Sequence, residues 1–333
     1  MADSPTPIAV GVYGLGDHAR RTILPAIDSS DAVQLAGIAT RDRSILDVEA
    51  ERWQCRAWCS LHDMVNSSDA DVIIVATPIA QHFEDGMAVL DAGKDLWCEK
   101  ALTRTLDEAE TLIANSRRMK RALCLSCPPL YHPQFQALKE FVHAGELGQI
   151  RSMSATFSFP HTDSSNTKYA PSMGGGALLD VGFYPLVVPA SLFEEEPDLL
   201  GANTVIEDGY AVDTFGAALL HYPETGIHHT ATWGYGGDYI NEIQIIGEAG
   251  TVIASPAFSK PEHLPFHLTL RRQNETKTLP VAKKNQYAAM LRTFADAALS
   301  SDTQERFRTQ ALRYQRLLSR VQSRSGQISY QAQ

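Results

Sequence analysis

The sequence predicts an α/β domain with a doubly wound parallel sheet, followed by an α+β domain with a large, mostly antiparallel open sheet. Short apolar segments alternate with longer amphipathic ones over the first 125 residues or so, which is the pattern of repeated βαβ units. The segment 71–76 is a continuous apolar run, as expected for a parallel strand buried on both faces. After residue 150, several segments alternate apolar with polar residues, as in a sheet with one covered face.

The first domain is expected to span residues 1–125. Its expected strands are Ile8–Tyr13, 34–39, 71–76, Asp95–Cys98 and 122–127. Its expected helices are 19–27, 45–53, 61–65, 83–92 and 106–118. Gly93 follows the fourth of these helices as a C-terminal stop signal.

The second domain is expected to span residues 126–333. Its expected strands are 150–159, 211–221, 228–233, 242–246, 251–254 and 267–272. Its expected helices are 133–144, 288–299 and 309–321, the first of which stops at Gly145.

Composition and charge narrow the classes of function. The chain has 333 residues, 44% hydrophobic and 20% charged, which is ordinary for a globular protein of about two domains. Its net charge of −10 and the lack of a basic stripe argue against nucleic acid as a partner. No run of about 18 apolar residues is found and the start does not resemble a secretion signal, so we expect a cytoplasmic protein without a membrane partner.

The five cysteines are an odd, sparse set and do not predict a disulfide framework. Cys124 and Cys127 have the spacing of redox or metal sites, but they lie in an apolar segment expected to be a strand. No metal site is predicted.

A glycine-rich turn follows the first expected strand and precedes a helix. It matches the G-x-G-x-x-A pattern with Gly14, Leu15, Gly16, Asp17, His18 and Ala19. Gly14 permits the tight turn, and Gly16 lets the backbone approach a pyrophosphate, to which the helix N-terminus offers N–H groups. This context predicts a dinucleotide-binding Rossmann domain. The alternative is a glycine-rich turn that binds something else.

The end of the second expected strand bears on the choice of cofactor. Thr40 occupies the place where an NAD-preferring site has a carboxylate, and Arg41 follows it. A hydroxyl and a guanidinium suit a 2′-phosphate, so NADP is favoured over NAD. If the strand ends two residues later, Asp42 holds the ribose and the cofactor is NAD.

Further cofactor contacts are expected where a later strand ends. Thr77 and Pro78 follow the segment 71–76, at the edge of the sheet that a dinucleotide crosses. His82 comes four residues after Pro78, near a helix start, and we assign it to the cofactor site without a catalytic role.

Three consecutive glycines, Gly174 to Gly176, precede Asp180 and Tyr184. Glycines suit a backbone that passes close to something else, such as a ligand. If the following turn is helical, Asp180 and Tyr184 share a face, and a carboxylate and a phenol would equip a site for proton transfer. Because Pro185 fits badly in a continuous helix, the helix could instead begin at Tyr184, with Asp180 in the loop before it.

Together these segments resemble the glucose-fructose oxidoreductase / inositol dehydrogenase family. The resemblance rests on the dinucleotide turn, on 76–78 with His82, on Glu99 and Lys100, and on 174–184. It implies that Glu99 and Lys100 lie in the cofactor site and that Lys100 is catalytic. The family's Glu-Lys-Pro is Glu-Lys-Ala here, with Ala101 in place of proline.

Tyr184 points to a sub-group, since much of the family has histidine at this place. The sub-group with tyrosine includes sugar 3-ketoreductases, dimeric dihydrodiol dehydrogenases and certain xylose dehydrogenases. The second domain is most similar to the sugar 3-ketoreductases, in the segments 131–134, 157–160, 168–169, 212–214, 247–251 and 257–261.

The resemblance implies roles for three residues in hydride transfer. Lys100 supplies a cation that lowers the pKa of the tyrosine and polarises the carbonyl, and Tyr184 is the general acid in reduction. Asp180 orients Lys100 or binds a sugar hydroxyl. The alternatives are a solvated Lys100 and an Asp180 that only caps local backbone.

The predicted function is that of an NADP(H)-dependent oxidoreductase acting on a secondary alcohol or ketone of a sugar, most simply a reductase of a nucleotide-linked keto-sugar. His132, Lys168 and Tyr169 are candidate substrate contacts, or else core and rim residues. The rivals are a free-sugar or dihydrodiol dehydrogenase and a non-catalytic dinucleotide sensor. An open sheet face predicts a homodimer or homotetramer.

Overall fold

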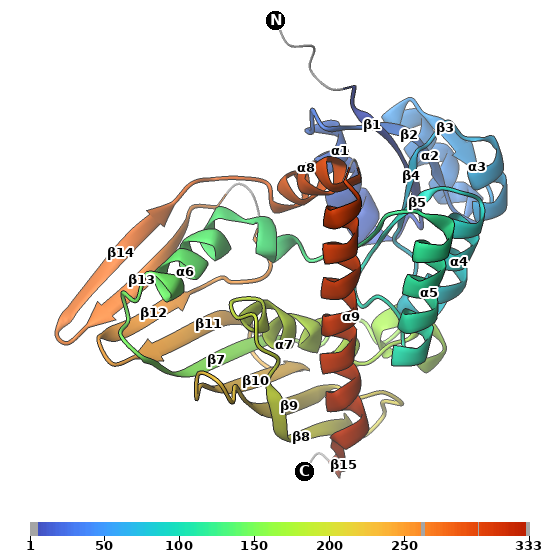
Figure 1. The fold of residues 1–333 in the computed structure, drawn as a ribbon. Coiled ribbons are helices and arrows are strands. Elements are labelled where there is room, and N and C mark those ends of the chain that lie inside the picture. Colours follow the sequence, from blue (N-terminus) through green and yellow to red (C-terminus); the bar gives the residue numbers. More distant parts are fainter. Residues whose placement is uncertain (1–5, 261–263, 299, 331–333) are drawn as a thin grey trace, which may run out of the picture. The chain divides into compact units, whose positions relative to one another are not determined.

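The structure is a computed structural model that describes residues 6–260, 264–298 and 300–330 (Figure 1). It divides into two compact units. The first contains Met1–Cys127 and Tyr287–Gln315, and the second contains Pro128–Gln286 and Arg316–Gln333. The first unit thus gives way to the second after Cys127, two residues from the expected boundary. The segment Tyr287–Gln315 was expected in the second domain but packs with the first.

The first unit has a six-stranded parallel sheet in the order β3-β2-β1-β4-β5-β6. Its strands are β1 (Ile8–Tyr13), β2 (Val33–Ala39), β3 (Arg56–Trp58), β4 (Val72–Val75), β5 (Asp95–Cys98) and β6 (Leu123–Leu125). All four residues of β4 are buried, as its apolar run predicts. The chain changes direction between β1 and β4, which is the place where a doubly wound sheet binds its ligand. The predicted doubly wound parallel sheet is confirmed.

Helices connect these strands. They are α1 (Leu24–Asp28), α2 (Arg43–Trp53), α3 (Leu61–Ser67), α4 (His82–Asp91) and α5 (Leu106–Met119). A π-helical turn, Ala19–Ile23, precedes α1. The start of α5 is fixed by a capping box, in which the Thr105 side chain accepts from Glu108 N–H and the Glu108 carboxylate accepts from Thr105 N–H.

The C-terminal helices are α8 (Gln286–Ala298) and α9 (Ser301–Arg324), and α8 with the part of α9 up to Gln315 completes the first unit. Phe294 of α8 packs edge-on against Trp97 of β5, with 5.3 Å between ring centroids. On α9, the Arg308 guanidinium donates to Ser116 Oγ at 2.9 Å and to the Arg121 carbonyl at 2.6 Å. These contacts explain why residues so late in the chain belong to the first unit.

The second unit has a nine-stranded sheet in the order β14-β13-β12-β11-β7-β10-β9-β8-β15. Its strands are β7 (Ile150–Phe159), β8 (Asp198–Glu207), β9 (Phe215–His221), β10 (His228–Tyr235), β11 (Ile240–Gly247), β12 (Gly250–Ala254), β13 (Phe266–Arg272), β14 (Glu275–Val281) and β15 (Gly326–Tyr330). Among the strand pairs of this sheet in the described residues, only β7–β10 and β8–β15 are parallel. The predicted mostly antiparallel sheet is confirmed, although β8, β14 and β15 were not predicted.

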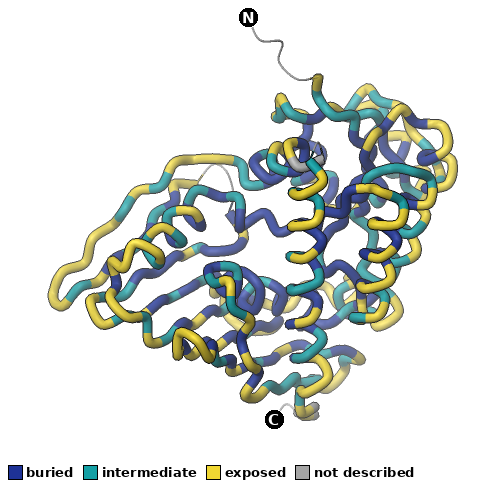
Figure 2. The backbone as a smooth tube through the Cα atoms, in the orientation of Figure 1, coloured by how far each residue is buried: buried dark blue, intermediate teal, exposed yellow. Residues whose placement is uncertain are grey.

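One face of this sheet is covered and the other is open. The helices α6 (Pro133–His143) and α7 (Phe183–Ala190) pack on the covered face, over the row formed by Met153, His229, Ile245 and Val252. The register places Phe215, Leu219, Ile240 and Ile246 on the opposite face, where each is at least 40% exposed. Figure 2 shows this alternation of buried and exposed residues along the strands.

Substitution of Arg308 tests the attachment of α9. Its side chain is 7% exposed, so Arg308→Ala leaves the Arg121 carbonyl without this donor and removes a buried cation. We expect a loss of about 2–4 kcal/mol in the free energy of unfolding, measured by urea titration. The matched control is Arg306→Ala, an exposed arginine on the same helix, which should change it by less than about 0.5 kcal/mol. Equal effects of both would contradict the anchoring role.

Candidate functional site

The turn after β1 has the geometry of a dinucleotide-binding loop. Gly14 has φ of +95°, and a Cβ there would lie 2.7 Å from the Ala76 carbonyl, so only glycine lets the turn pack on the end of β4. A Cβ on Gly16 would meet no atom within 4 Å. The backbone at Gly16 therefore borders open space that a side chain would fill. Leu15 is buried beneath the turn, and Asp17 pairs with Arg20 at its surface.

The position at which β2 ends determines whether Thr40 or Asp42 stands at the end of the strand. The strand ends at Ala39, so Thr40 and Arg41 follow it directly. Arg41 donates to Gln81 Oε1 at 3.2 Å. The Asp42 carboxylate accepts from the N–H groups of Ser44 and Ile45 and caps α2. The condition for Asp42 to replace Thr40, a strand two residues longer, is not met.

His82 is buried between two loops that follow strands. Its Nε2 lies 2.7 Å from the Thr77 carbonyl and its Nδ1 lies 2.8 Å from the Ala101 carbonyl. Burial lowers the pKa of the imidazole, although both carbonyls and the Glu99 charge oppose this shift. The ring is 1% exposed, so it holds the backbone at Thr77 and Ala101 from a buried position. A direct contact of His82 with a cofactor stays a prediction.

Glu99 is a buried carboxylate at the end of β5. Burial opposes its ionisation, but the neighbouring His18 imidazole, a hydrogen bond from Ser126 and the charge of Lys100 outweigh burial and lower its pKa. The nearest His18 contact is Nε2 to Oε1 at 3.8 Å. Lys100, the next residue, is half-buried, and its peptide bond to Ala101 is cis.

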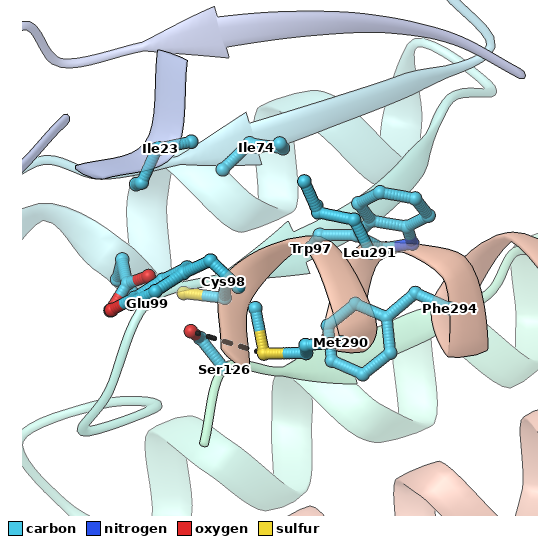
Figure 3. A pocket seen from close by; sticks show the side chains of 10 residues that line it. Ile23, Ile74, Trp97, Cys98, Glu99, Ser126, Met290, Leu291 and Phe294 are labelled. Carbon is cyan, nitrogen blue, oxygen red and sulfur yellow. Dashed lines mark hydrogen bonds between the residues drawn. The ribbon is translucent and has the colours of Figure 1, made fainter. Parts of the chain in front are cut away.

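A small cavity lies beside Glu99 within the first unit (Figure 3). Glu99 and Ser126 mark its polar end, and the rings of Trp97 and Phe294 mark its apolar end, with Met290 of α8 between them. The cavity is lined by Ile23, Ile74, Trp97, Cys98, Glu99, Ser126, Tyr287, Met290, Leu291 and Phe294. Its lining is too apolar for the phosphates of a dinucleotide.

In the second unit, the three glycines pack against protein atoms. A Cβ on Gly175 would lie 2.5 Å from the Lys168 carbonyl, and one on Gly176 would lie 2.3 Å from Asp213 Oδ1. Gly176 also has φ of +127°. The glycines therefore let this loop pass close to Lys168 and Asp213. The expectation of a close approach is correct, but the neighbouring atoms found here belong to the protein itself.

Asp213 anchors the helical segment that follows these glycines. Its carboxylate accepts from Leu178 N–H at 2.7 Å, and its carbonyl accepts from Ala177 N–H at 2.8 Å. Burial raises the pKa of Asp213 to about 6, although the bond from Leu178 opposes the shift. Asp213 was not predicted as a site residue, because it lies 35 positions from Leu178.

Asp180 and Tyr184 lie four residues apart on a continuous helical segment. A π-helical turn, Leu178–Gly182, contains Asp180 and runs directly into α7, which contains Tyr184. The alternative of Asp180 in a loop is wrong. Pro185 is the third residue of α7 and directly follows the junction with the π-helical turn. The Tyr184 ring packs against Phe157 and Phe258, with centroid distances of 5.6 and 5.9 Å.

An aromatic cluster surrounds Asp180. Tyr235 is 3% exposed, and its hydroxyl donates to Asp180 Oδ2 at 2.9 Å. The Lys168 ammonium lies 4.6 Å from the Phe159 ring centroid and 5.4 Å from that of Tyr235. Tyr169 packs edge-on against Tyr235 at 5.3 Å. The structure thus brings together Lys168, Tyr169 and Asp180. Tyr235 joins them without having been predicted as a site residue.

His132 lies apart from this cluster in its contacts. The ring is fully buried, its Nδ1 accepts from Gln134 N–H at 3.0 Å, and it caps α6. Burial, and then the Lys260 charge, lower its pKa to about 4, so the imidazole is neutral at pH 7. This placement fits the core-residue alternative better than a substrate contact.

Among residues 6–260, 264–298 and 300–330, no group of three or more His, Cys, Asp or Glu side chains is placed to hold a metal ion. The helical stretch Pro171–Ala190 is long and apolar enough for a bilayer, but 78% of its apolar window is buried within the second unit.

The raised pKa of Asp213 predicts a pH-dependent contribution to stability. A folded-state value of about 6, above the usual 3.8, means that the folded protein holds the proton more tightly. The contribution is complete below pH 4 and is lost as the pH rises through about 6. We expect the melting temperature of wild type minus that of Asp213→Asn to fall between pH 4 and 7. A difference that rises with pH would contradict this environment of Asp213.

Comparison with protein families gives two matches. The oxidoreductase family with the NAD-binding Rossmann fold matches residues 8–126. The GFO/IDH/MocA C-terminal domain matches residues 135–253. These are the N-terminal and C-terminal domains of the family that the sequence was expected to resemble.

Similar proteins with a known activity cover nearly the whole chain. A dTDP-3,4-didehydro-2,6-dideoxy-alpha-D-glucose 3-reductase from Actinomadura kijaniata is 28% identical over 97% of both chains. A reductase of the same name from Streptomyces antibioticus is 31% identical and covers 87% of this chain and 88% of its own. The crystal structure of KijD10, a 3-ketoreductase from A. kijaniata with NADP and TDP-benzene, has a TM-score of 0.93 at 28% identity, covering 97% and 99% of the two chains. The chain is therefore an oxidoreductase of the GFO/IDH/MocA family.

Proposed function

We propose that this chain is an NADP(H)-dependent oxidoreductase of sugars that reduces a nucleotide-linked keto-sugar at a secondary carbonyl. The observation that carries the proposal is the likeness, over nearly the whole chain, to KijD10, which was crystallised with NADP and TDP-benzene. Other KijD10 structures carry a replaced lysine or a replaced tyrosine. These are the residue types of Lys100 and Tyr184, to which we assign the chemistry.

The residues of the first unit fit a dinucleotide. The open space at Gly16 leaves room for a diphosphate, which the N–H groups of the turn Gly14–Asp17 would bind. Thr40 and Arg41 would hold the 2′-phosphate of NADP, and Asp42 is engaged in capping. Thr77, Pro78 and Glu99 would line the same site. When bound, the nicotinamide supplies or accepts the hydride.

The protein's part in the reaction is to move a proton and to balance charge. Reduction of a ketone places negative charge on the carbonyl oxygen, and we assign its protonation to the Tyr184 phenol. A phenol with an ordinary pKa of about 10 becomes a better acid partner when a cation favours the phenolate, and we assign this cation to Lys100. Asp180 is held by Tyr235 and would bind a sugar hydroxyl or orient the lysine.

The aromatic cluster around Asp180 is the proposed substrate region of the second unit. Lys168 and Tyr169 would contact the sugar or its nucleotide, since an ammonium suits phosphate and an aromatic ring stacks on sugar faces. We leave His132 out of the proposed site, because its ring is fully buried as a helix cap.

We also propose a cytoplasmic homodimer or homotetramer. All five cysteines are free thiols, as is usual for the cytoplasm. The open face of the second sheet carries the exposed residues Phe215, Leu219, Ile240 and Ile246, and a second copy of the chain would bury them.

Removing Lys100 or Tyr184 tests the assignment. We expect Lys100→Ala and Tyr184→Phe to lower kcat/KM about 100- to 10,000-fold, while the Kd of NADPH stays within about threefold. Loss of NADPH absorbance with nucleotide-linked keto-sugars measures turnover, and Lys277→Ala, an exposed lysine on β14, is the control. Full turnover in either variant would remove that residue from the mechanism.

The substrate panel separates the rival functions. Oxidation of pentoses or of a trans-dihydrodiol with NADP⁺, without reduction of any keto-sugar, would favour the dehydrogenase alternatives. Binding of NADPH without turnover of any carbonyl compound would favour the sensor.

A charged residue on the open sheet face tests the assembly. We expect Leu219→Lys to convert the oligomer to monomers, because the ammonium would lose its hydration in the interface. Light scattering after size-exclusion chromatography measures the mass, and Thr225→Lys, in an exposed turn, is the control. A wild-type mass of about 36.5 kDa would contradict the proposal.

A further inference from the structure

The rings of Tyr184, Phe157 and Phe258 pack against one another in the second unit. The Tyr184 ring centroid lies 5.6 Å from that of Phe157, on β7, and 5.9 Å from that of Phe258, and the two phenylalanine centroids lie 5.5 Å apart. Both phenylalanines are buried. In the helical segment 177–190, all of which is described, Asp180 and Tyr184 are the two residues that are partly exposed. Tyr184 is therefore accessible, while its ring rests against two buried neighbours.

One of these neighbours, Phe258, belongs to a loop. The loop follows β12, which ends at Ala254, and residues 255–260 form neither strand nor helix. Ala257 and Phe258 are nevertheless buried. Because such a segment lacks the regular hydrogen bonds of a strand or helix, its buried N–H and carbonyl groups need other partners. The position of the Phe258 ring depends on what supplies them.

The side chain of Asn241, on β11, supplies most of these partners. It is 4% exposed, and its Oδ1 accepts from Ala257 N–H at 2.8 Å and from Phe258 N–H at 2.7 Å. Its Nδ2 donates to the Ser259 carbonyl at 3.3 Å and to the Tyr239 hydroxyl at 2.9 Å. The amide thus uses both of its acceptor positions and both of its donor hydrogens. Without it, the buried N–H of Phe258 would lose this acceptor, which is costly.

Two further side chains bond to the same loop. The buried ammonium of Lys260 donates to the Ala257 carbonyl, and Gln286 Nε2 donates to the Phe258 carbonyl at 3.4 Å. The backbone of Phe258 is therefore bonded through both its N–H and its carbonyl, and its ring is packed on two sides by Phe157 and Tyr184. Fully satisfied buried polar networks of this kind hold one arrangement of the chain.

We propose that Asn241 is a positioning residue for the reaction: it fixes the loop 257–259, and the Phe258 ring of this loop holds the Tyr184 phenol in one orientation. The inference rests on the proposed function, which assigns the proton transfer to Tyr184. A misplacement of about 1 Å in a reacting group can cost about 100-fold in rate. Because Asn241, Phe258 and Tyr184 all lie in the second unit, their loss should slow the chemical step and leave NADPH binding unchanged.

The test measures single-turnover reduction of a nucleotide-linked keto-sugar by enzyme-bound NADPH, followed as loss of NADPH absorbance. We expect Asn241→Ala and Phe258→Leu to lower this rate about 10- to 100-fold, while the Kd of NADPH and the KM of the sugar stay within about threefold. The matched control is Asn115→Ala. Asn115 is 5% exposed, and its side chain bonds to Asp91 and Arg118 in the first unit, so this variant should lose stability and keep the wild-type rate.

Double-mutant cycles separate positioning from a purely structural role. If Asn241 acts through the Tyr184 hydroxyl, its loss has little further effect once that hydroxyl is gone, so Asn241→Ala should slow the Tyr184→Phe variant by less than about threefold. Asn241→Ala combined with Phe258→Leu should be about as slow as the slower single variant, because both act through one ring. Melting temperatures would be recorded for every variant. If Asn241→Ala does not fold, Phe258→Leu in the wild-type and Tyr184→Phe backgrounds provides the same test.

Two results would overturn this inference and leave the proposed function standing. The first is a wild-type single-turnover rate in either Asn241→Ala or Phe258→Leu. The second is an equal fold loss of rate in the wild-type and Tyr184→Phe backgrounds, as a purely structural role would give. Full turnover by Tyr184→Phe would instead overturn the assignment of Tyr184 and this inference together.

Discussion

Asp213 accepts hydrogen bonds from the start of a helical segment, and these bonds fix where the two side chains of the second unit to which we assign function lie. Leu178 and Ala177 open the segment, and their N–H groups have no partners within it. Asp213 supplies those partners from a distant part of the chain, at 2.7 and 2.8 Å. Gly176 makes the approach possible, since any side chain there would collide with the carboxylate. Asp180 and Tyr184 then follow at fixed positions along the same helical segment.

In the first unit, the buried carboxylate of Glu99 likewise connects distant segments of the chain. A carboxylate such as Glu99 is costly to bury unless it is paired and hydrogen-bonded. Its partners come from three places, namely His18 in the dinucleotide turn, Ser126 after β6 and the adjacent Lys100. The carboxylate thereby connects the turn, the sheet and the residue to which we assign catalysis. The buried His82 ring contacts two backbone carbonyls in a similar way and connects the loops that contain Thr77 and Ala101.

Local patterns predicted most of the fold. The alternation of strands and helices predicted the parallel sheet, and the break in pattern near residue 125 lay close to the change of unit at Cys127. The strand β3 was missed because it has three residues and no buried side chain. The strand β14 was missed because most of its residues are exposed and give no apolar alternation.

Residues of the proposed site could be predicted only where they are neighbours in sequence. Gly14 to Asp17, Thr40 with Arg41, and Asp180 with Tyr184 belong to short motifs whose spacing carries the signal. Tyr235, Asp213 and Asn241 have no such motif, because each reaches its partner through tertiary packing across 16 to 55 positions. His132 shows the converse case. An imidazole can bond a sugar hydroxyl, which made this residue a candidate substrate contact or a core residue, and in the structure its ring caps a helix.

The first unit is discontinuous in sequence, and this constrains how the protein can be made. Its final helices lie at Tyr287–Gln315, so a nascent chain released from the ribosome through Cys127 lacks the residues that cover Trp97 and bond to Ser116. The intervening unit must be synthesised before the earlier one can close. An excised fragment that ends near Cys127 would therefore expose core side chains and tend to aggregate. During translation, the same apolar surface stays exposed, and available to a chaperone, until Tyr287–Gln315 has been synthesised.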